Sequence, residues 1–287
     1  MIYEIKNDFL SVKVDSFGAE VISALGKDGF EYIYTGDTWS GHAPVLFPLC
    51  GRIKDERYTH LGKEYSMKLH GLAKYYEFSL KESTEDSLTL LFASDGTTRE
   101  HYPFDFNFTV RYTLSDKSLL AVFTVENLSG EPLPYMVGWH PGFNYDAAAS
   151  HEEFYLDFGD AALSLHPVID RAFIARNTLP FPTVDGKYKI NDDELDDYDT
   201  LVLENTNYSV KFASDSASHG VRLTWSDNIP YFCVWRAPFK KAPYLCLEPW
   251  SNLPGDGSMP EDFALRDMIR IPVGASEDYR FTVDFLF

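Results

Sequence analysis

The chain has 287 residues, of which 45% are hydrophobic and 16% aromatic, and its formal net charge is −19. This size and composition allow one domain with a large core, which we expect to span residues 1–287. The negative charge argues against a nucleic-acid or anionic-membrane partner, because phosphate groups attract clustered Lys and Arg side chains. We therefore expect a neutral small molecule as the partner.

Short segments in which apolar and polar residues alternate predict half-buried strands. In chain order they are Leu10–Val14, Ser87–Phe92, Phe106–Tyr112, Leu120–Val125, Ser209–Phe212 and Val221–Trp225. Hairpin turns or short loops are predicted at Lys27–Gly29, Asp95–Gly96, Ser115–Asp116, Ser129–Gly130 and Asp185–Gly186. The sequence shows no helical periodicity of useful length. The pattern predicts an all-β fold, a large antiparallel β-sandwich.

The first residues and the cysteines predict a cytoplasmic protein. Met1–Lys6 lacks the charged and apolar regions of a signal peptide, and the chain has no run of 18 apolar residues. Cys50, Cys233 and Cys246 are odd in number, lack CxxC spacing and lie in apolar or aromatic segments. We expect them to be buried free thiols, which favours a reducing compartment.

Three stretches place titratable residues beside Trp, Pro or Gly. They are Pro48–Arg52 leading on to His70, Gly138–Pro141, and Leu247–Trp250. His140 and an environment-raised Glu248 suit proton transfer near neutral pH. Trp139 and Trp250 offer aromatic faces of the kind that pack on a pyranose ring. Together these residues predict an enzyme that acts on a small sugar.

Glu248 lies in a segment that otherwise reads as a buried strand, Ala242–Leu247. A carboxylate in such a place is costly unless it has a partner or a function. A buried salt bridge to Arg52 or another base is the structural alternative to a catalytic role.

These stretches, in this order, resemble those of the aldose 1-epimerase (mutarotase) superfamily, and most closely a bacterial, lactose-operon-associated branch of mutarotase-like proteins. The resemblance runs from Ile5–Val14 to the closing strand at Tyr279–Phe287. It implies the supersandwich topology of galactose-mutarotase-like proteins. It also implies an isomerase that interconverts the α and β anomers of an aldose.

The resemblance also implies roles for individual residues. Glu248 corresponds to the base at the C1 hydroxyl, and His140 to the acid at the ring oxygen. His70 would donate a hydrogen bond nearby, Arg52 would orient sugar hydroxyls, and Asp199 matches a family aspartate that precedes a strand near the site. No cofactor and no metal are implied.

The substrate remains open because two motifs depart from authentic galactose mutarotases. Trp139–Asn144 reads Trp-His-Pro-Gly-Phe-Asn where those enzymes have Asn-His-Thr-Tyr-Phe-Asn, and His70–Ala73 reads His-Gly-Leu-Ala in place of His-Gly-Gly. Basic residues between Arg52 and Lys74 leave a glucose-6-phosphate 1-epimerase-like activity as an alternative, although a hairpin with solvated lysines on its outer face is the favoured explanation for them.

A catalytically silent sugar-binding or sensing protein on the same fold is the alternative from another class. Glycosidase or lyase chemistry ranks third, because a glycosidase needs two carboxylates at a set spacing and only Glu248 is nominated.

No metal site is predicted elsewhere. The acidic cluster Asp192–Asp197 lacks the glycine and the terminal Glu of a calcium-binding EF-hand loop, so we expect a solvated loop. The remaining histidines show no metal-ligand spacing, and they are His60, His101, His151, His166 and His219.

Overall fold

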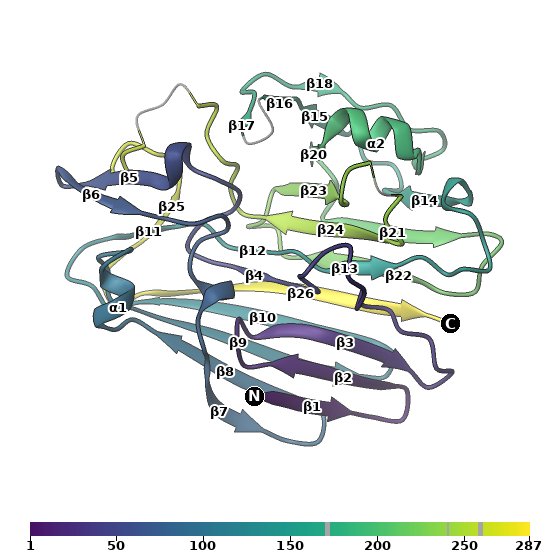
Figure 1. The fold of residues 1–287 in the computed structure, drawn as a ribbon, viewed down its shortest axis with the longest axis horizontal. Helices are drawn as coiled ribbons and strands as arrows, with labels where there is room; N and C mark the ends of the chain where they lie inside the picture. Colours follow the sequence, from purple (N-terminus) through teal and green to yellow (C-terminus); the bar gives the residue numbers. More distant parts are fainter. Residues whose placement is uncertain (170–172, 240, 258–260) are drawn as a thin grey trace.

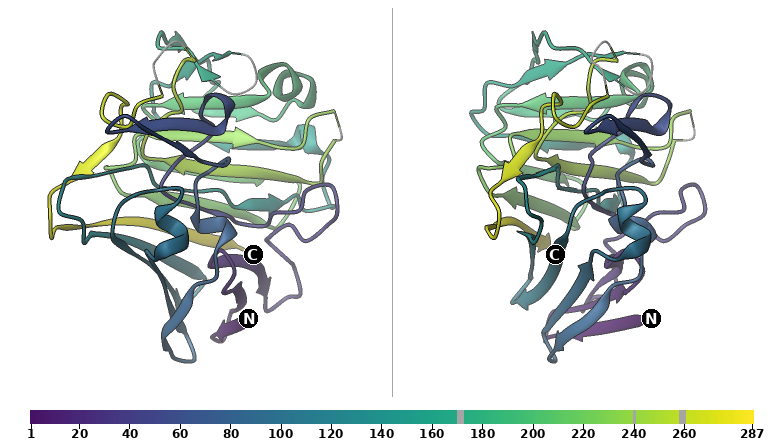
Figure 2. Two further views of the ribbon diagram at one scale, coloured as in Figure 1. Left: turned by 60° about the vertical axis from the view of Figure 1, so that its left-hand side comes forward. Right: turned by 90° about the vertical axis from the view of Figure 1, so that its left-hand side faces the viewer.

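The computed structural model describes residues 1–169, 173–239, 241–257 and 261–287, and in this part of the chain two large sheets dominate (Figure 1, Figure 2). One sheet has nine strands and the other has eight, counted over these described residues. Their strands pair in the antiparallel sense. The expected all-β antiparallel architecture is confirmed. None of the described helices has the length and hydropathy that crossing a membrane requires.

The nine-stranded sheet runs in the order β19 (Lys187–Lys189), β14 (Phe154–Asp157), β21 (Ser209–Ser214), β22 (Gly220–Trp225), β26 (Ser276–Leu286), β10 (Ser118–Asn127), β9 (Phe106–Ser115), β8 (Ser87–Ala93) and β7 (Ser79–Ser83) over the described chain. The eight-stranded sheet runs in the order β18 (Leu179–Pro180), β15 (Ser164–His166), β20 (Thr200–Glu204), β23 (Tyr231–Trp235), β24 (Tyr244–Trp250), β12 (Gly138–Trp139) and β4 (Val45–Leu46), with β13 (Gly142–Asn144) also paired to β24, again over the described chain.

Smaller elements complete the described structure. The short sheets are β1 (Ile2–Lys6) with β2 (Leu10–Asp15) and β3 (Glu20–Gly26), β5 (Arg57–His60) with β6 (Lys63–Ser66), β11 (Leu133–Tyr135) with β25 (Ile269–Ile271), and β16 (Val168–Ile169) with β17 (Phe173–Ile174). The helical segments are α1 (Gly96–Arg99), α2 (Asp192–Tyr198) and the 3-10 turns η1 (Lys54–Glu56), η2 (Ala73–Tyr75) and η3 (His151–Glu153).

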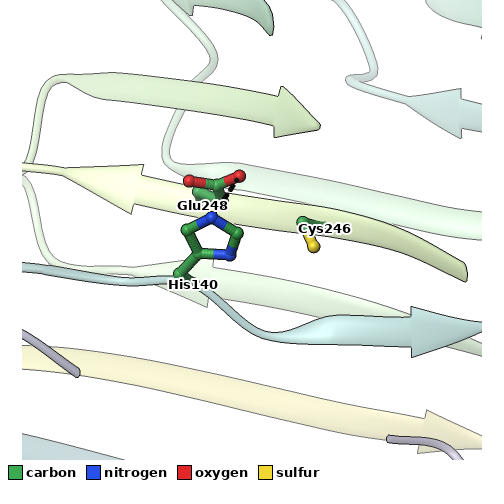
Figure 3. A group of neighbouring side chains, drawn as sticks. All are labelled: His140, Cys246 and Glu248. Carbon is green, nitrogen blue, oxygen red and sulfur yellow. Dashed lines mark ion pairs between the residues drawn. The ribbon is translucent and has the colours of Figure 1, made fainter. Parts of the chain in front are cut away.

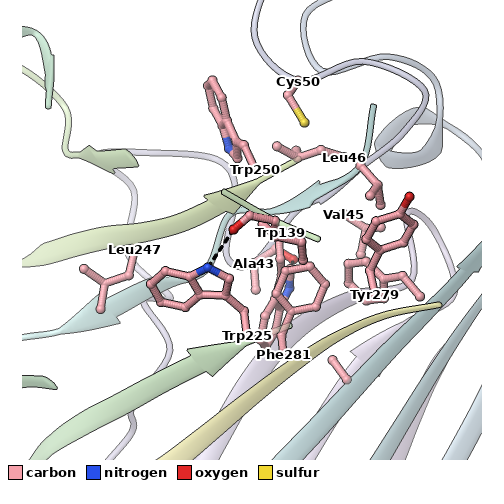
Figure 4. Packing of buried hydrophobic residues seen from close by; sticks show 14 of the residues in the cluster. Ala43, Val45, Leu46, Cys50, Trp139, Trp225, Leu247, Trp250, Tyr279 and Phe281 are labelled. Carbon is pink, nitrogen blue, oxygen red and sulfur yellow. Dashed lines mark hydrogen bonds between the residues drawn. The ribbon is translucent and has the colours of Figure 1, made fainter. Parts of the chain in front are cut away.

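Alternation along the strands builds the core between the two large sheets. In β9 and β10 every second side chain is buried, as a half-buried strand requires. Aromatic rings then bridge the layers. The ring centroids of Trp139 in β12 and Phe281 in β26 lie 5.8 Å apart (Figure 4). Trp225 of β22 stacks on Phe232 of β23, with ring centroids 5.1 Å apart. All six strands predicted from alternation are present.

The predicted turn at Asp185–Gly186 is confirmed, whereas the one at Asp95–Gly96 is wrong. Asp185 and Gly186 have φ angles of 50° and 76° and connect Val184 to Lys187, which pair with each other. Positive φ at both central positions is the signature of a type I′ turn. Asp95 instead begins α1, because its carboxylate accepts hydrogen bonds from the Thr97 and Thr98 backbone N–H groups.

The acidic cluster is also not the solvated loop that we expected. It forms α2, capped by the side chain of Asn191. Asp192 and Asp196 both pair with Arg236, which is only 2% exposed. A buried cation thus compensates part of the negative charge of this helix. The three cysteines are free and buried, as predicted.

Candidate active site

His70 is held in place by an exchange of hydrogen bonds with Gly51. The Gly51 N–H donates to His70 Nδ1 at 3.1 Å, and the His70 N–H donates to the Gly51 carbonyl at 2.9 Å. Because Nδ1 accepts, the proton of the neutral ring lies on Nε2. The next residue, Gly71, has a φ of 83°, and a Cβ there would lie 2.4 Å from the Phe47 carbonyl oxygen. Only glycine fits this position.

His140 and Glu248 meet because neighbouring strands carry them. His140 directly follows β12, and its backbone N–H donates to the Pro44 carbonyl oxygen at 3.0 Å. Glu248 lies in β24, which pairs with β12. His140 Nε2 lies 3.2 Å from Glu248 Oε1 (Figure 3), and the two residues are only 7% and 1% exposed. A histidine and a carboxyl group thus share a desolvated contact.

Burial controls the protonation of these groups. It raises the pKa of the Glu248 carboxyl well above its usual range, and the Trp250 indole and the charge on Lys74 oppose this only in part. It lowers the pKa of His140 to about 3, with Lys74 adding to the effect. Burial also lowers the pKa of His70 well below its usual range, assisted by His140, Lys74 and Arg52. Both imidazoles are therefore neutral near pH 7, and Glu248 holds a proton more readily than a free glutamate.

These side chains face a cavity of about 500 Å³, a size typical of small-molecule sites. Six of the residues nominated from the sequence line it: Arg52, His70, His140, Asp199, Glu248 and Trp250. Asp199 reaches the cavity from the C-terminal end of α2, where its φ is 60°. Segments far apart in the chain thus converge on one site.

Trp139 is the exception, and its expected sugar contact is wrong. Its side chain is 1% exposed and does not line the cavity. The indole N–H donates to the Ala43 carbonyl at 3.1 Å, and the ring packs in the core near Phe281 (Figure 4). The reason is the alternation of extended backbone: His140 faces the cavity, so its neighbour faces the opposite layer.

Two other tryptophans, which we did not nominate from the sequence, supply aromatic walls. Trp39 stacks on the His140 ring with ring centroids 5.1 Å apart, and Trp235 meets that ring edge-on with ring centroids 5.8 Å apart. Both line the cavity. Strand alternation could have indicated Trp235. Cys233 pairs with Glu248, and Trp235, which pairs with Cys246, comes two residues after Cys233 and therefore faces the same side of the sheet. Trp39 lies between strands, where alternation gives no direction.

Lys74 is the charged residue that we missed. It lines the cavity from η2, and its positive charge acts on His70, His140 and Glu248. Burial lowers its own pKa, while Glu20 and Glu248 oppose that shift. Other basic residues of the same stretch are exposed, as predicted for a solvated hairpin and its flanks: Lys54, Arg57, Lys63 and Lys68. Sequence alone gave no signal separating Lys74 from them.

A third buried group, Cys246, lies beside the pair. Potential ligand atoms of His140, Cys246 and Glu248 lie within 4.8 Å of one another (Figure 3). A metal would need the thiolate, but burial raises the pKa of the Cys246 thiol well above its usual range. A metal would therefore have to displace the thiol proton, and the expectation of a metal-free site stays a prediction.

Comparison with known proteins agrees with the family resemblance found in the sequence. The sequence profile described as aldose 1-epimerase matches residues 1–255. The chain belongs to this family. It is 30% identical over 269 residues to the plasmid-encoded protein LacX of Lactococcus lactis subsp. lactis, with 88% of each chain covered.

Two crystal structures share the fold over almost the entire chain. A galactose mutarotase related enzyme from Lactobacillus acidophilus is 30% identical, with a TM-score of 0.94 and coverage of 100% of this chain and 98% of that one. A galactose mutarotase-like protein from Lactobacillus casei is 27% identical, with a TM-score of 0.92 and coverage of 99% and 100%. The family resemblance and the galactose mutarotase-like sandwich expected from the sequence are confirmed.

Proposed function

We propose that this protein is an aldose 1-epimerase that interconverts the α and β anomers of a small aldose by acid–base opening and closing of the ring. The observation that carries the proposal is the buried contact of 3.2 Å between His140 and Glu248 in a cavity lined by tryptophans. Such a cavity excludes much of the water and provides flat apolar faces for a pyranose.

Ring opening requires one proton to leave the C1 hydroxyl and one to reach the ring oxygen, while the bond between C1 and that oxygen breaks. Glu248 takes the hydroxyl proton, and His140 delivers the other. The aldehyde rotates, and closure on its other face uses the same groups in reverse. His70 donates through Nε2, while Arg52 and Asp199 orient hydroxyls.

The pair has to carry one proton for this cycle. In the free protein, burial favours that proton on Glu248 and a neutral His140. In the productive complex it lies on His140, across the 3.2 Å contact. The charge on Lys74 favours the carboxylate form of Glu248, and it also disfavours the charged form of His140. No step requires a metal or a cofactor.

A hexose 6-phosphate is the second candidate substrate, favoured by the cations Arg52 and Lys74 in the cavity wall. A neutral aldose remains our first choice because of the net charge of −19. The free thiols suit the reducing cytoplasm, where we place the protein.

Polarimetry on a panel of neutral aldoses and their phosphates tests the proposal directly. We expect the anomeric equilibration of at least one sugar to exceed the rate in buffer alone. If the sugars bind and every rate matches the buffer, the protein is a silent sugar binder.

A further inference from the structure

A second pocket, of about 620 Å³, adjoins the sugar cavity, and Ile174 and Pro254 line both. Its wall contains three arginines, Arg176, Arg266 and Arg270, and two aspartates, Asp256 and Asp267. This composition stands out in a chain whose net charge is −19. The mechanism above uses none of these five residues.

Two of the arginines are already occupied by partners. Arg176 Nε lies 2.7 Å from an Asp256 carboxylate oxygen. Arg270 donates from its guanidinium to backbone carbonyls, with Phe263 at 2.6 Å and Arg266 at 2.9 Å among them. These two side chains hold the wall together.

Arg266 differs because one edge of its guanidinium is unused. The side chain is only 4% exposed, and its Nη1 pairs with Glu261. Within the described part of the chain, its Nε and Nη2 have no hydrogen-bond partner. Buried donors without a partner are costly, so a ligand that accepts from them binds favourably.

The free edge has a specific shape. The Nε and Nη2 hydrogens of an arginine lie side by side in one plane and match two oxygens of a phosphate or carboxylate. The guanidinium also faces the pocket wall at Gly255, where a Cβ would lie 3.6 Å from Nη1 and 3.9 Å from Nη2. Gly255 thus lies against the guanidinium, and a larger side chain at this position would contact it.

We propose that the second pocket is an oxyanion site, in which Arg266 binds a phosphate or carboxylate group through Nε and Nη2. The group belongs either to a substituent of the sugar in the adjoining cavity or to a separate small anion. The link to a sugar rests on the proposed function, whereas the oxyanion site itself does not.

Calorimetric titration with inorganic phosphate tests the site at constant ionic strength, with chloride as the control anion. Arg266→Lys keeps the charge but loses the fork, so we expect phosphate affinity to fall by about tenfold or more. Absence of phosphate binding by the wild type, or equal binding by wild type and variant, would overturn the proposal.

Gly255→Val provides a second test that leaves the pair between Arg266 and Glu261 intact. Its branched side chain should cover the guanidinium and weaken phosphate binding by at least about tenfold, whereas Gly255→Ala adds only a Cβ at ordinary contact distance and should keep most of the binding. Circular dichroism checks the fold of each variant. Unchanged affinity in a folded Gly255→Val protein counts against the site.

Kinetics then identify the source of the oxyanion. A loss of kcat/KM in Arg266→Lys that is confined to glucose 6-phosphate, with glucose unaffected, assigns the site to the sugar's own phosphate. Equal effects on the two sugars, together with lost phosphate binding, assign it to a separate anion. Because the titration needs no turnover, an inactive protein with an intact oxyanion site would disprove the proposed function alone.

Discussion

His140 Nε2 lies 3.2 Å from Glu248 Oε1, and burial moves the pKa values of the two groups in opposite directions. An exposed pair would leave the histidine as the more basic group, with a pKa of roughly 6.5 against roughly 4.3 for the carboxyl. Here the proton of the free pair favours the carboxyl. The pair has to be considered as one unit that titrates in two coupled steps.

Replacing either member of this pair should remove catalysis while preserving the fold. For Glu248→Gln we expect the polarimetric rate above the buffer blank to fall by about 10² to 10⁴, because the amide keeps the shape and loses the base. His140→Asn should show a comparable loss. Glu64→Gln, at an exposed position of β6, is the matched control and should retain the wild-type rate. Sugar binding measured by titration should survive in both site variants, and a wild-type rate in Glu248→Gln would remove it from the mechanism.

Lys74→Met should move the pH profile of kcat/KM without disrupting the cavity. The charge on Lys74 lowers the pKa of Glu248, His140 and His70, so its removal raises all three. Both limbs of the profile should therefore shift to higher pH. Lys63→Met, on the exposed hairpin, should leave the limbs in place. A uniform loss of rate with unshifted limbs would mean that Lys74 acts only through packing.

Prolonged dialysis against a strong chelator should not change the rate. The Cys246 thiol beside the pair is protonated, because burial raises its pKa, and the proposed chemistry uses protons only. The measurement is the polarimetric rate before and after dialysis. Loss of activity that a metal ion restores would require a mechanism built on His140, Cys246 and Glu248 as ligands.

The fold could be predicted largely from sequence, because alternation in segments such as Phe106–Tyr112 reports directly which faces are buried. The motif residues His140 and Glu248 could also be found, since a carboxylate in a buried strand requires an explanation. Trp139 obeys the same rule, because adjacent residues of an extended chain face opposite sides and His140 and Trp139 cannot both line the cavity.

Other parts of the site depend on tertiary structure alone. Trp39 reaches His140 from a segment without regular secondary structure, and Lys74 differs from solvated lysines only through its surroundings. The helix of Asp192–Tyr198 likewise pairs with Arg236, which directly follows β23 and lies 38 positions beyond the end of the helix. No local pattern contains these relationships.

Gly71→Ala should destabilise the protein far more than Gly62→Ala. Both glycines have positive φ, 83° and 76°, but a Cβ at position 71 would lie 2.4 Å from the Phe47 carbonyl oxygen, whereas one at position 62 would meet nothing within 4 Å. We expect a loss of about 1 kcal/mol at Gly62 and at least about twice that at Gly71. Urea unfolding measures both. Equal losses would show that the backbone around His70 yields to the added methyl group.

His219 should make stability depend on pH. Its Nδ1 lies 2.7 Å from Asp146 and its Nε2 lies 3.0 Å from Asp28, and the ring stacks on Phe30 at 4.1 Å. Burial lowers the pKa of His219, but the bonds to Asp146 and Asp28 outweigh it and raise the pKa above its usual value. Although burial opposes it, the hydrogen bonds with His219 and backbone groups lower the pKa of both aspartates.

The raised pKa of His219 means that its stabilisation is fully present below the unfolded value of roughly 6.5 and is lost as pH rises through the folded value. The lowered pKa values of Asp28 and Asp146 mean that the stabilisation contributed by these two carboxylates is present above a pH of roughly 3.9 and is lost at lower pH. His219→Asn should therefore reduce the free energy of unfolding more at about pH 5.5 than at about pH 8.5. His101→Asn, whose ring bonds Ser66 instead of a carboxylate, is the control and should show little such difference. Equal losses for His219→Asn at the two pH values would mean that the contact stabilises through packing and not through charge.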